Sequence, residues 1–364
     1  MRVAILGTGN VGLACAADLT LVGHEIRLWG RERTELVGVL ANAAVASGPG
    51  LIHLESAERH GDAHIAMVTL DIAAAVEGAE VIFVTDPAYT HDDITRAFAP
   101  HVRDGQMVAY LPANLSTPSA QRILEAAGVP GILLVEMAAP PYGTRRGLKG
   151  EAVIALRTIC NLAAALPASR TNDAVAILQR IYPEIAAGSD ILDVALVNPT
   201  SVIHPALVIT NAGAIEHFGT NYDIHAQGTT AATLRLIYAV DAERIAVREA
   251  LGYGEPHFSL QTYYDATRPG LRFFSGAGSK AVAASGLWRD PITMEHRYLR
   301  EDVSYGLSLV SDLGRLVGVP TPMVDALIQI ASILRGTDLR RRDRSTSALG
   351  LTGVSPESLR VRLR

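Results

Sequence analysis

The sequence predicts an α/β Rossmann domain with a doubly wound, mostly parallel sheet, followed by an all-α C-terminal domain. Short apolar segments alternate with helical segments through the first half of the chain. This alternation is typical of a parallel sheet that is covered by helices on both faces. Beyond about residue 188 the strand patterns stop and long helical patterns follow. We therefore predict two domains, residues 1–187 for dinucleotide binding and residues 188–364 for substrate binding and catalysis.

The composition excludes several classes of protein. The chain has 364 residues, enough for two domains, and 49% of them are hydrophobic. A net charge of −5 does not favour a nucleic-acid partner. Cys15 and Cys160 form neither a metal-binding motif nor a disulfide framework, which suits a reducing compartment. No apolar run reaches the length of a bilayer span, so we expect no membrane partner. We also expect a cytoplasmic protein with no metal site.

The first predicted strand, Val3–Leu6, runs directly into Gly7-x-Gly9-x-x-Gly12 and an Ala-rich helix. In this context the first glycine permits a tight turn, the second lets a pyrophosphate approach, and the third lets the helix pack closely. The pyrophosphate then binds the free N–H groups at the helix start. A signal peptide is excluded because the glycines and two polar residues interrupt the apolar run. The predicted coenzyme-binding residues are Gly7, Thr8, Gly9, Asn10, Val11 and Gly12.

The end of the second predicted strand, Ile26–Trp29, favours NADP(H) over NAD(H). Units that bind NAD carry an acid here, which bonds the ribose 2′-hydroxyl. This chain continues with Gly30-Arg31-Glu32-Arg33-Thr34 instead. The guanidinium of Arg31, helped by Arg33 or Thr34, could bind a 2′-phosphate. If both arginines are only solvated loop charges, Glu32 takes the acidic role and NAD(H) is the coenzyme.

Five more strands are predicted in the first domain, and two of the loops that follow them are candidates for the site. In this fold class the loops at the carboxyl ends of the strands face the nicotinamide. We expect Pro87 to contact the coenzyme and Asn114 to line the substrate pocket. The segment Leu51–Leu70 is interpreted as a loop plus a hairpin strand. The five strands are Ala66–Val68, Val81–Thr85, Met107–Tyr110, Leu133–Glu136 and Val153–Leu156.

The second domain is predicted to consist of helices, and its cleft with the first domain should hold the site. Asn198-Pro199 is typical of a helix start, with Asn as the cap and Pro at the first helical position. His204 falls on the second turn, and Pro205 should kink the helix. The faces of such helices could form a homodimer interface or pack internally. The predicted helices are Asn198–Phe218, Thr229–Leu251, Glu301–Val317, Met323–Leu334 and a shorter Ser355–Leu363.

His204 and Asp302 are polar residues with two interpretations each. His204 lies among apolar residues and is either a core histidine or a catalytic one. Asp302 is either an acid that the dipole favours at a helix start or the partner of His204. A carboxylate bonded to one imidazole nitrogen fixes the tautomer and raises the basicity of the other nitrogen.

The chain resembles the octopine and opine dehydrogenases over nearly its whole length. The resemblance implies that His204 and Asp302 form an acid/base dyad and that Arg297 binds a substrate carboxylate. Asn198 could bond the coenzyme or the substrate or only cap its helix, and Tyr142 could line the pocket or belong to the core. The segments that match are Gly7-x-Gly9-x-x-Gly12, Pro87-Ala88-Tyr89, Glu136 with Pro141-Tyr142-x-x-Arg145, Ala165-Leu166-Pro167, Asn198-Pro199 with His204-Pro205, and Arg297-Tyr298-Leu299-x-Glu301-Asp302.

The resemblance implies reductive condensation of an amino acid with a 2-oxo acid such as pyruvate. The segment Ala139-Pro140-Pro141 lacks a threonine that is common in the family, which leaves the substrate open. One alternative is a 2-hydroxy-acid or ketopantoate-type reductase, which would need a catalytic lysine. The chain offers only Lys149 and Lys280, and neither is in the expected place. A non-catalytic NADP-sensing protein is the alternative from another class.

Overall fold

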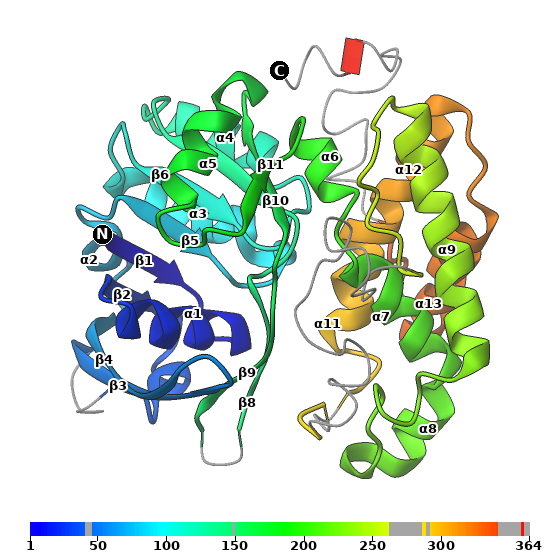
Figure 1. Ribbon diagram of the computed structural model, residues 1–364, viewed down its shortest axis with the longest axis horizontal. Helices are drawn as coiled ribbons and strands as arrows, with labels where there is room; N and C mark the ends of the chain where they lie inside the picture. Colours follow the sequence, from blue (N-terminus) through cyan, green and yellow to red (C-terminus); the bar gives the residue numbers. More distant parts are fainter. Residues whose placement is uncertain (41–45, 148–149, 262–285, 289–291, 341–357, 360–364) are drawn as a thin grey trace.

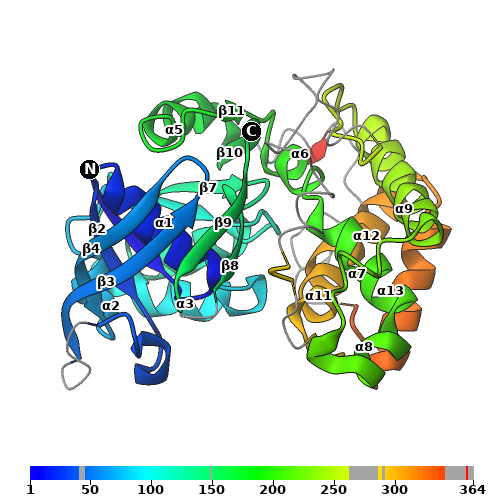
Figure 2. The ribbon, with the colours of Figure 1, turned by 60° about the horizontal axis from the view of Figure 1, so that its bottom comes forward.

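The computed structural model describes residues 1–40, 46–147, 150–261, 286–288, 292–340 and 358–359. A domain built on one twisted sheet lies beside a domain of helices (Figures 1 and 2), which confirms the predicted fold class. Lys149, Lys280 and most of the predicted helix 355–363 lie outside the described residues. The last strand ends at Ala187, and we keep the domain boundary after this residue as a proposal.

The described part of the chain forms an 11-stranded sheet with the order β11-β10-β7-β6-β5-β1-β2-β4-β3-β9-β8. Its central strands, β7 to β4, are parallel, and antiparallel pairs occur toward both edges. The strands are β1 (Arg2–Leu6), β2 (Glu25–Trp29), β3 (Ser47–Ser56), β4 (His60–Thr69), β5 (Val81–Val84), β6 (Met107–Tyr110), β7 (Leu133–Met137), β8 (Tyr142–Arg146), β9 (Ala152–Arg157), β10 (Asn161–Leu166) and β11 (Ile185–Ala187).

The sheet contains strands that the apolar runs did not reveal, namely β3, β8, β10 and β11. The segment predicted as a loop plus one strand is a full hairpin of β3 and β4. Both strands alternate exposed and buried residues because only one face is covered, so neither gives a continuous apolar run. The alanines of β10 (Asn161–Leu166) have low strand propensity, although the strand is buried.

Helices cover both faces of the sheet. The side chains of β1 point alternately to these two faces, so they pack into two separate cores. Val3 and Ile5 pack with α1 and α5, whereas Ala4 and Leu6 pack on the face covered by α2, α3 and α4. These four side chains of β1 are fully buried. This arrangement fixes the carboxyl ends of the parallel strands, where the glycine loop lies. The helices are α1 (Asn10–Leu21), α2 (Ile72–Val76), α3 (His91–Phe98), α4 (Thr117–Ala126) and α5 (Thr171–Leu178).

Two of the predicted helices of the second domain differ from those observed. The helix predicted over Asn198–Phe218 is broken at Asn211 into α7 and α8. The helix predicted from Glu301 begins with a π-helical segment, Asp302–Leu307, before α12. The helices of this domain are α6 (Ile191–Ala195), α7 (Thr200–Thr210), α8 (Ala212–Phe218), α9 (Ala231–Ala250), α11 (Arg297–Arg300), α12 (Ser308–Val317) and α13 (Pro322–Arg335).

The centre of the helical domain is strongly apolar. Contrary to the sequence-based expectation, the stretch Ile191–Thr210 is long and apolar enough to cross a membrane, but 89% of its most apolar window is buried inside the protein. Such burial is what a core segment of a water-soluble domain shows. The long helix α9 packs against α7, α12 and α13, so much of its surface is used within the chain.

Candidate active site

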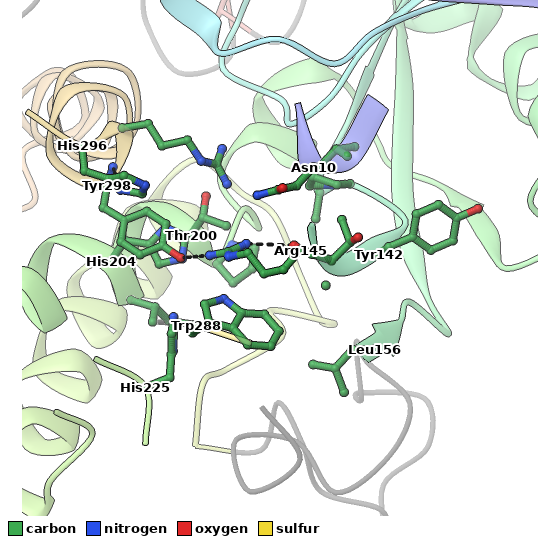
Figure 3. Close-up of a pocket in the computed structure, with 18 of the residues that line it drawn as sticks. Asn10, Tyr142, Arg145, Leu156, Thr200, His204, His225, Trp288, His296 and Tyr298 are labelled. Carbon is green, nitrogen blue, oxygen red and sulfur yellow. Dashed lines mark hydrogen bonds between the residues drawn. The ribbon is translucent and has the colours of Figure 1, made fainter. Parts of the chain in front are cut away.

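A cavity of about 400 Å³ lies between the two domains. The glycine loop and β8 line it from the sheet side, and α7, α9 and α11 line it from the helical side. Figure 3 shows side chains from both domains converging on it. The structure thus places a cavity where the coenzyme loop meets the predicted dyad.

The structure brings His204 and Asp302 together, although 98 residues separate them. The imidazole Nδ1 lies 2.7 Å from Oδ2 of Asp302, and the hydroxyl of Thr200 donates to Oδ1 at 2.9 Å. Both side chains are almost fully buried. Because Nδ1 is engaged by the carboxylate, Nε2 is the imidazole nitrogen left for chemistry in the cavity.

The backbone between α7 and the π-helical segment explains this meeting. A Cβ on Gly306 would lie 1.9 Å from the hydroxyl of Ser201, so only glycine lets the two elements approach so closely. The ring of Tyr298 stacks on the imidazole of His204, with 3.6 Å between centroids and 16° between planes. A π-helical segment is often found at a functional site, and here it sets the direction of Asp302.

Burial and nearby cations control the charge of this pair. Burial lowers the pKa of His204 well below its usual value, and the guanidinium groups of Arg297 and Arg145 lower it further. Burial raises the pKa of Asp302 to about 7, against the opposing effects of Arg297 and the Thr200 hydroxyl. The imidazole is therefore neutral near neutral pH, which is the form of a base.

Arg297 lines the cavity and is held by Glu301, whose carboxylate lies 3.3 Å from its guanidinium. The other oxygen of Glu301 accepts from the backbone N–H of Ala88 at 2.9 Å. Arg300 lies over the ring of Tyr89 at 3.8 Å. The loop after β5, with Pro87 on the cavity wall, is thus fastened to α11 in the other domain.

The glycine loop has the shape that a pyrophosphate needs. Gly7 has a φ of +128°, which side chains other than hydrogen rarely permit. A Cβ on Gly12 would lie 1.9 Å from the carbonyl oxygen of Gly7, whereas a Cβ on Gly9 would meet no atom within 4 Å. The open space at Gly9 lies at the start of α1, where N–H groups bind phosphate. The residues present therefore fit a dinucleotide.

The residues after β2 are already engaged with acids. A guanidinium nitrogen of Arg31 lies 3.7 Å from the carboxylate of Asp86. Glu35 accepts from the backbone N–H of Arg31 at 2.7 Å and from the hydroxyl of Thr8 at 3.2 Å. Arg33 and Thr34 are exposed in a 3₁₀ turn. The acid that reaches the glycine loop is Glu35, which the sequence reasoning missed in considering Glu32.

Of three predicted substrate contacts, Tyr142 lines the cavity, whereas Asn114 and Asn198 are not among its lining residues. The hydroxyl of Tyr142 donates to Asp18 at 2.6 Å, and Figure 3 shows this side chain directed away from His204 and Tyr298. Asn114 is buried behind the cavity wall, where its N–H donates to Glu136 at 2.9 Å. Asn198 accepts from the backbone N–H of Thr200 at 3.1 Å, but the cap residue of α7 is Pro199, one position after the predicted cap.

Several cavity residues were missed by the sequence reasoning. Arg145 and Tyr298 stood inside the familial motifs, but nothing in the sequence indicated that they would meet. His225, Trp288 and His296 come from loops with no recognisable pattern. Among the described residues no group of three or more His, Cys, Asp or Glu side chains could hold a metal.

Comparison with known proteins decides the family. The chain is 31% identical to the opine dehydrogenase of Arthrobacter sp. (strain 1C) over 363 residues, which cover 98% of this chain and 97% of that protein. The chain belongs to the opine dehydrogenase family. These enzymes are NAD(P)-dependent oxidoreductases, and the family model of the NAD/NADP octopine/nopaline dehydrogenase α-helical domain matches residues 187–335.

Other members of the opine dehydrogenase family are more distant. The octopine dehydrogenase of Mizuhopecten yessoensis is 24% identical over 90% of this chain and 88% of that protein. An octopine dehydrogenase solved with NADH and L-arginine has a TM-score of 0.70 at 17% identity, covering 99% of this chain and 97% of that one. A yersinopine dehydrogenase with NADP⁺ bound has a TM-score of 0.61 at 14% identity, covering 100% and 97%. These solved structures support the two-domain fold.

The N-terminal part of this chain also matches a second family model, that of ketopantoate reductase PanE/ApbA, over residues 3–112. The shared part is the coenzyme domain, whereas the His204–Asp302 pair and Arg297 lie in the helical domain that matches the octopine/nopaline model.

Proposed function

We propose that this protein is an opine dehydrogenase that joins the amino group of an amino acid to a 2-oxo acid such as pyruvate and reduces the resulting imine. The observation that carries the proposal is the His204–Asp302 pair, which faces a cavity that also holds two arginines and the glycine loop. When bound, the nicotinamide supplies the hydride that reduces the imine carbon. The loop residues 7–12, with Pro87, would hold the coenzyme.

In this proposal His204 performs both proton transfers. Nε2 first takes a proton from the ammonium of the amino acid, so that the free amine adds to the ketone carbon. The protonated imidazole then gives that proton to the carbinolamine oxygen, which leaves as water. Asp302 keeps Nδ1 protonated and stabilises the transient imidazolium.

The charges of Arg145 and Arg297 link substrate binding to the basicity of His204. In the free protein burial is the main cause of the lowered pKa of His204, and Arg297 and Arg145 lower it further. Substrate carboxylates bound to these arginines would cancel much of their charge and would therefore raise the pKa of His204 again. The imidazole would thus be a stronger base with substrates bound than in the free protein.

The composition of the cavity wall favours an amino acid substrate with an uncharged side chain. Among the described lining residues Asp86 is the one carboxylate, and it lies against the glycine loop on the coenzyme side. A cationic side chain would find no counter-charge on the rest of this wall and would lose hydration. An apolar wall also excludes water, which protects the imine from hydrolysis. It is formed by Ile203, Leu234, Ile237, Leu260 and Trp288.

We propose NADP(H) as the favoured coenzyme. Gly30 leaves the usual place of the acid empty, and Arg31 follows it with a guanidinium that could turn to a 2′-phosphate. In the free protein the guanidinium of Arg31 lies against Asp86, which would have to release it, while Glu35 accepts from the backbone N–H of Arg31. NAD(H) would be favoured if Asp86 holds the guanidinium.

The test is coenzyme oxidation with a grid of 2-oxo acids, each with and without a mixture of amino acids, using NADPH and NADH. Oxidation that needs both substrates would support the proposal. Oxidation with the oxo acid alone would instead support the reductase that the match to the ketopantoate model favours. His204→Ala should abolish turnover with almost unchanged NADPH affinity, and a variant with near-normal turnover would refute the dyad.

A further inference from the structure

We propose that Arg145 is a second carboxylate-binding residue, which holds the carboxylate of the amino acid while Arg297 holds that of the 2-oxo acid. This inference rests on the proposed function and assigns the two ends of its product. The product carries two carboxylates, one on each carbon that flanks the amine. A site for such a molecule needs two cations on one cavity.

Arg145 and Arg297 reach the cavity from different domains. Arg145 lies on β8 of the sheet domain, and Arg297 lies on α11 of the helical domain. Both line the cavity. Figure 3 shows the side chain of Arg145 extending toward Tyr298 and His204 across the space between the domains. The two arginines therefore enter the cavity from different domains, and both guanidinium groups lie near Tyr298.

Arg145 is fixed in place before any substrate arrives. Its residue is 7% exposed, and its guanidinium lies 4.8 Å from the ring centroid of Trp288. One amino group donates to the carbonyl of Thr144 at 2.9 Å and the other donates to the hydroxyl of Tyr298. The charge of the guanidinium acts on the imidazole groups that line the cavity. This charge lowers the pKa of His225 and His296 as well as that of His204.

Tyr298 contacts His204 and lies next to both arginines. Its ring stacks on His204, its hydroxyl accepts from Arg145, and the guanidinium of Arg297 lies 5.9 Å from its centroid. The base must reach the oxygen on the reacting carbon, and the carboxylate of the oxo acid is bonded to that same carbon. Arg297 lies in the same domain as His204, on the helix that leads directly into Asp302, whereas Arg145 reaches the cavity from the sheet domain, so Arg297 suits this carboxylate. The amino-acid carboxylate lies two bonds further along, toward Arg145.

The experiment compares the KM values for the two substrates in Arg145→Met, Arg145→Lys, Arg297→Met and Tyr298→Phe. We expect Arg145→Met to raise the KM for the amino acid about 10- to 100-fold, the typical cost of a lost charged hydrogen bond. The KM for the oxo acid should stay within about twofold. Arg297→Met should show the reverse, and Arg145→Lys should lie between, because lysine keeps the charge without the planar fork.

A second substrate separates binding from mere support of the fold. The carboxamide of the same amino acid keeps the amine but has no anionic carboxylate. The unmodified protein should prefer the acid strongly, whereas Arg145→Met should use acid and carboxamide about equally well. NADPH binding, followed by fluorescence, shows that each variant is folded.

The outcomes distinguish the inference from the proposed function. Equal increases in both KM values, or a Tyr298→Phe variant that reproduces Arg145→Met, would show that Arg145 only supports Tyr298 and would overturn the inference. An unchanged preference for the acid in Arg145→Met would overturn it too. Failure of the unmodified protein to oxidise either NADPH or NADH with any pair of substrates would overturn the proposed function, and the role of Arg145 with it.

Discussion

Replacing Asp302 with Asn tests whether the carboxylate stabilises charge on His204. Asparagine has the same shape, and its carbonyl oxygen can still accept from Nδ1, so the ring should stay in place. At a pH well above the Asp302 pKa of about 7, the substitution removes the negative charge alone. Because Asp302 is 3% exposed, solvent would not replace that charge.

The structure gives the size of the effect. With 2.7 Å between Nδ1 and Oδ2, the charges of the protonated ring and the carboxylate are about 4 Å apart. At an effective dielectric constant of about 20 their attraction is about 4 kcal/mol. Each ~1.4 kcal/mol changes a rate tenfold, so turnover should fall about a thousandfold.

The assay is single-turnover oxidation of NADPH after rapid mixing with both substrates, together with NADPH affinity. We expect the rate to fall and the affinity to stay within about twofold. Thr200→Val is the matched control, because it removes one neutral hydrogen bond to the same carboxylate and should slow turnover only about five- to tenfold. A rate for Asp302→Asn within tenfold of normal would refute the electrostatic reasoning.

Three further predictions concern the coenzyme half of the cavity. Burial raises the pKa of Asp86 to about 6, so its neutral form favours folding below about pH 4 and this contribution is lost as pH rises through 6. In urea unfolding, Asp86→Asn should therefore raise the free energy of unfolding by about 1–3 kcal/mol at pH 7.5 and by almost nothing at pH 4. The control Asp173→Asn, at an exposed position, should change the free energy of unfolding little at either pH. Equal increases for Asp86→Asn at both pH values would contradict this. Glu35→Gln should improve kcat/KM for NADPH about three- to tenfold and leave that for NADH unchanged, measured with both coenzymes in parallel; a loss with NADPH would show that the acid supports the coenzyme. Gly12→Ala should abolish coenzyme binding in a fluorescence titration because the added carbon would overlap a carbonyl, whereas Gly213→Ala, which has open space, should bind normally.

The coenzyme half of the site could be predicted from the sequence because its geometry is local. A strand, three glycines and a helix within twelve residues leave few conformations, and the observed close approach at Gly12 follows from that spacing. The central strands were predictable for a related reason, since strands buried on both faces are continuous apolar runs. Strands with one exposed face, such as β3, were missed because their pattern alternates.

The catalytic half depended on contacts between distant residues. The residues around His204 and Asp302 suggested a pair, and the resemblance favoured it, but the direction of Asp302 comes from a π-helical segment that no propensity predicts. The structure also showed that Asn114, which was expected in the pocket, is buried against Glu136, and that Tyr142 lines the cavity while its hydroxyl donates to Asp18.

The sequence by itself determined the fold class, the glycine loop and the residue types available for proton transfer, because these depend on periodicity and on spacing within short segments. Only the tertiary structure decided which cations share the cavity. Arg145 and Tyr298 are 153 residues apart and meet because β8 and α11 approach from separate domains. Packing between elements far apart in the chain sets that meeting, and no local pattern records it.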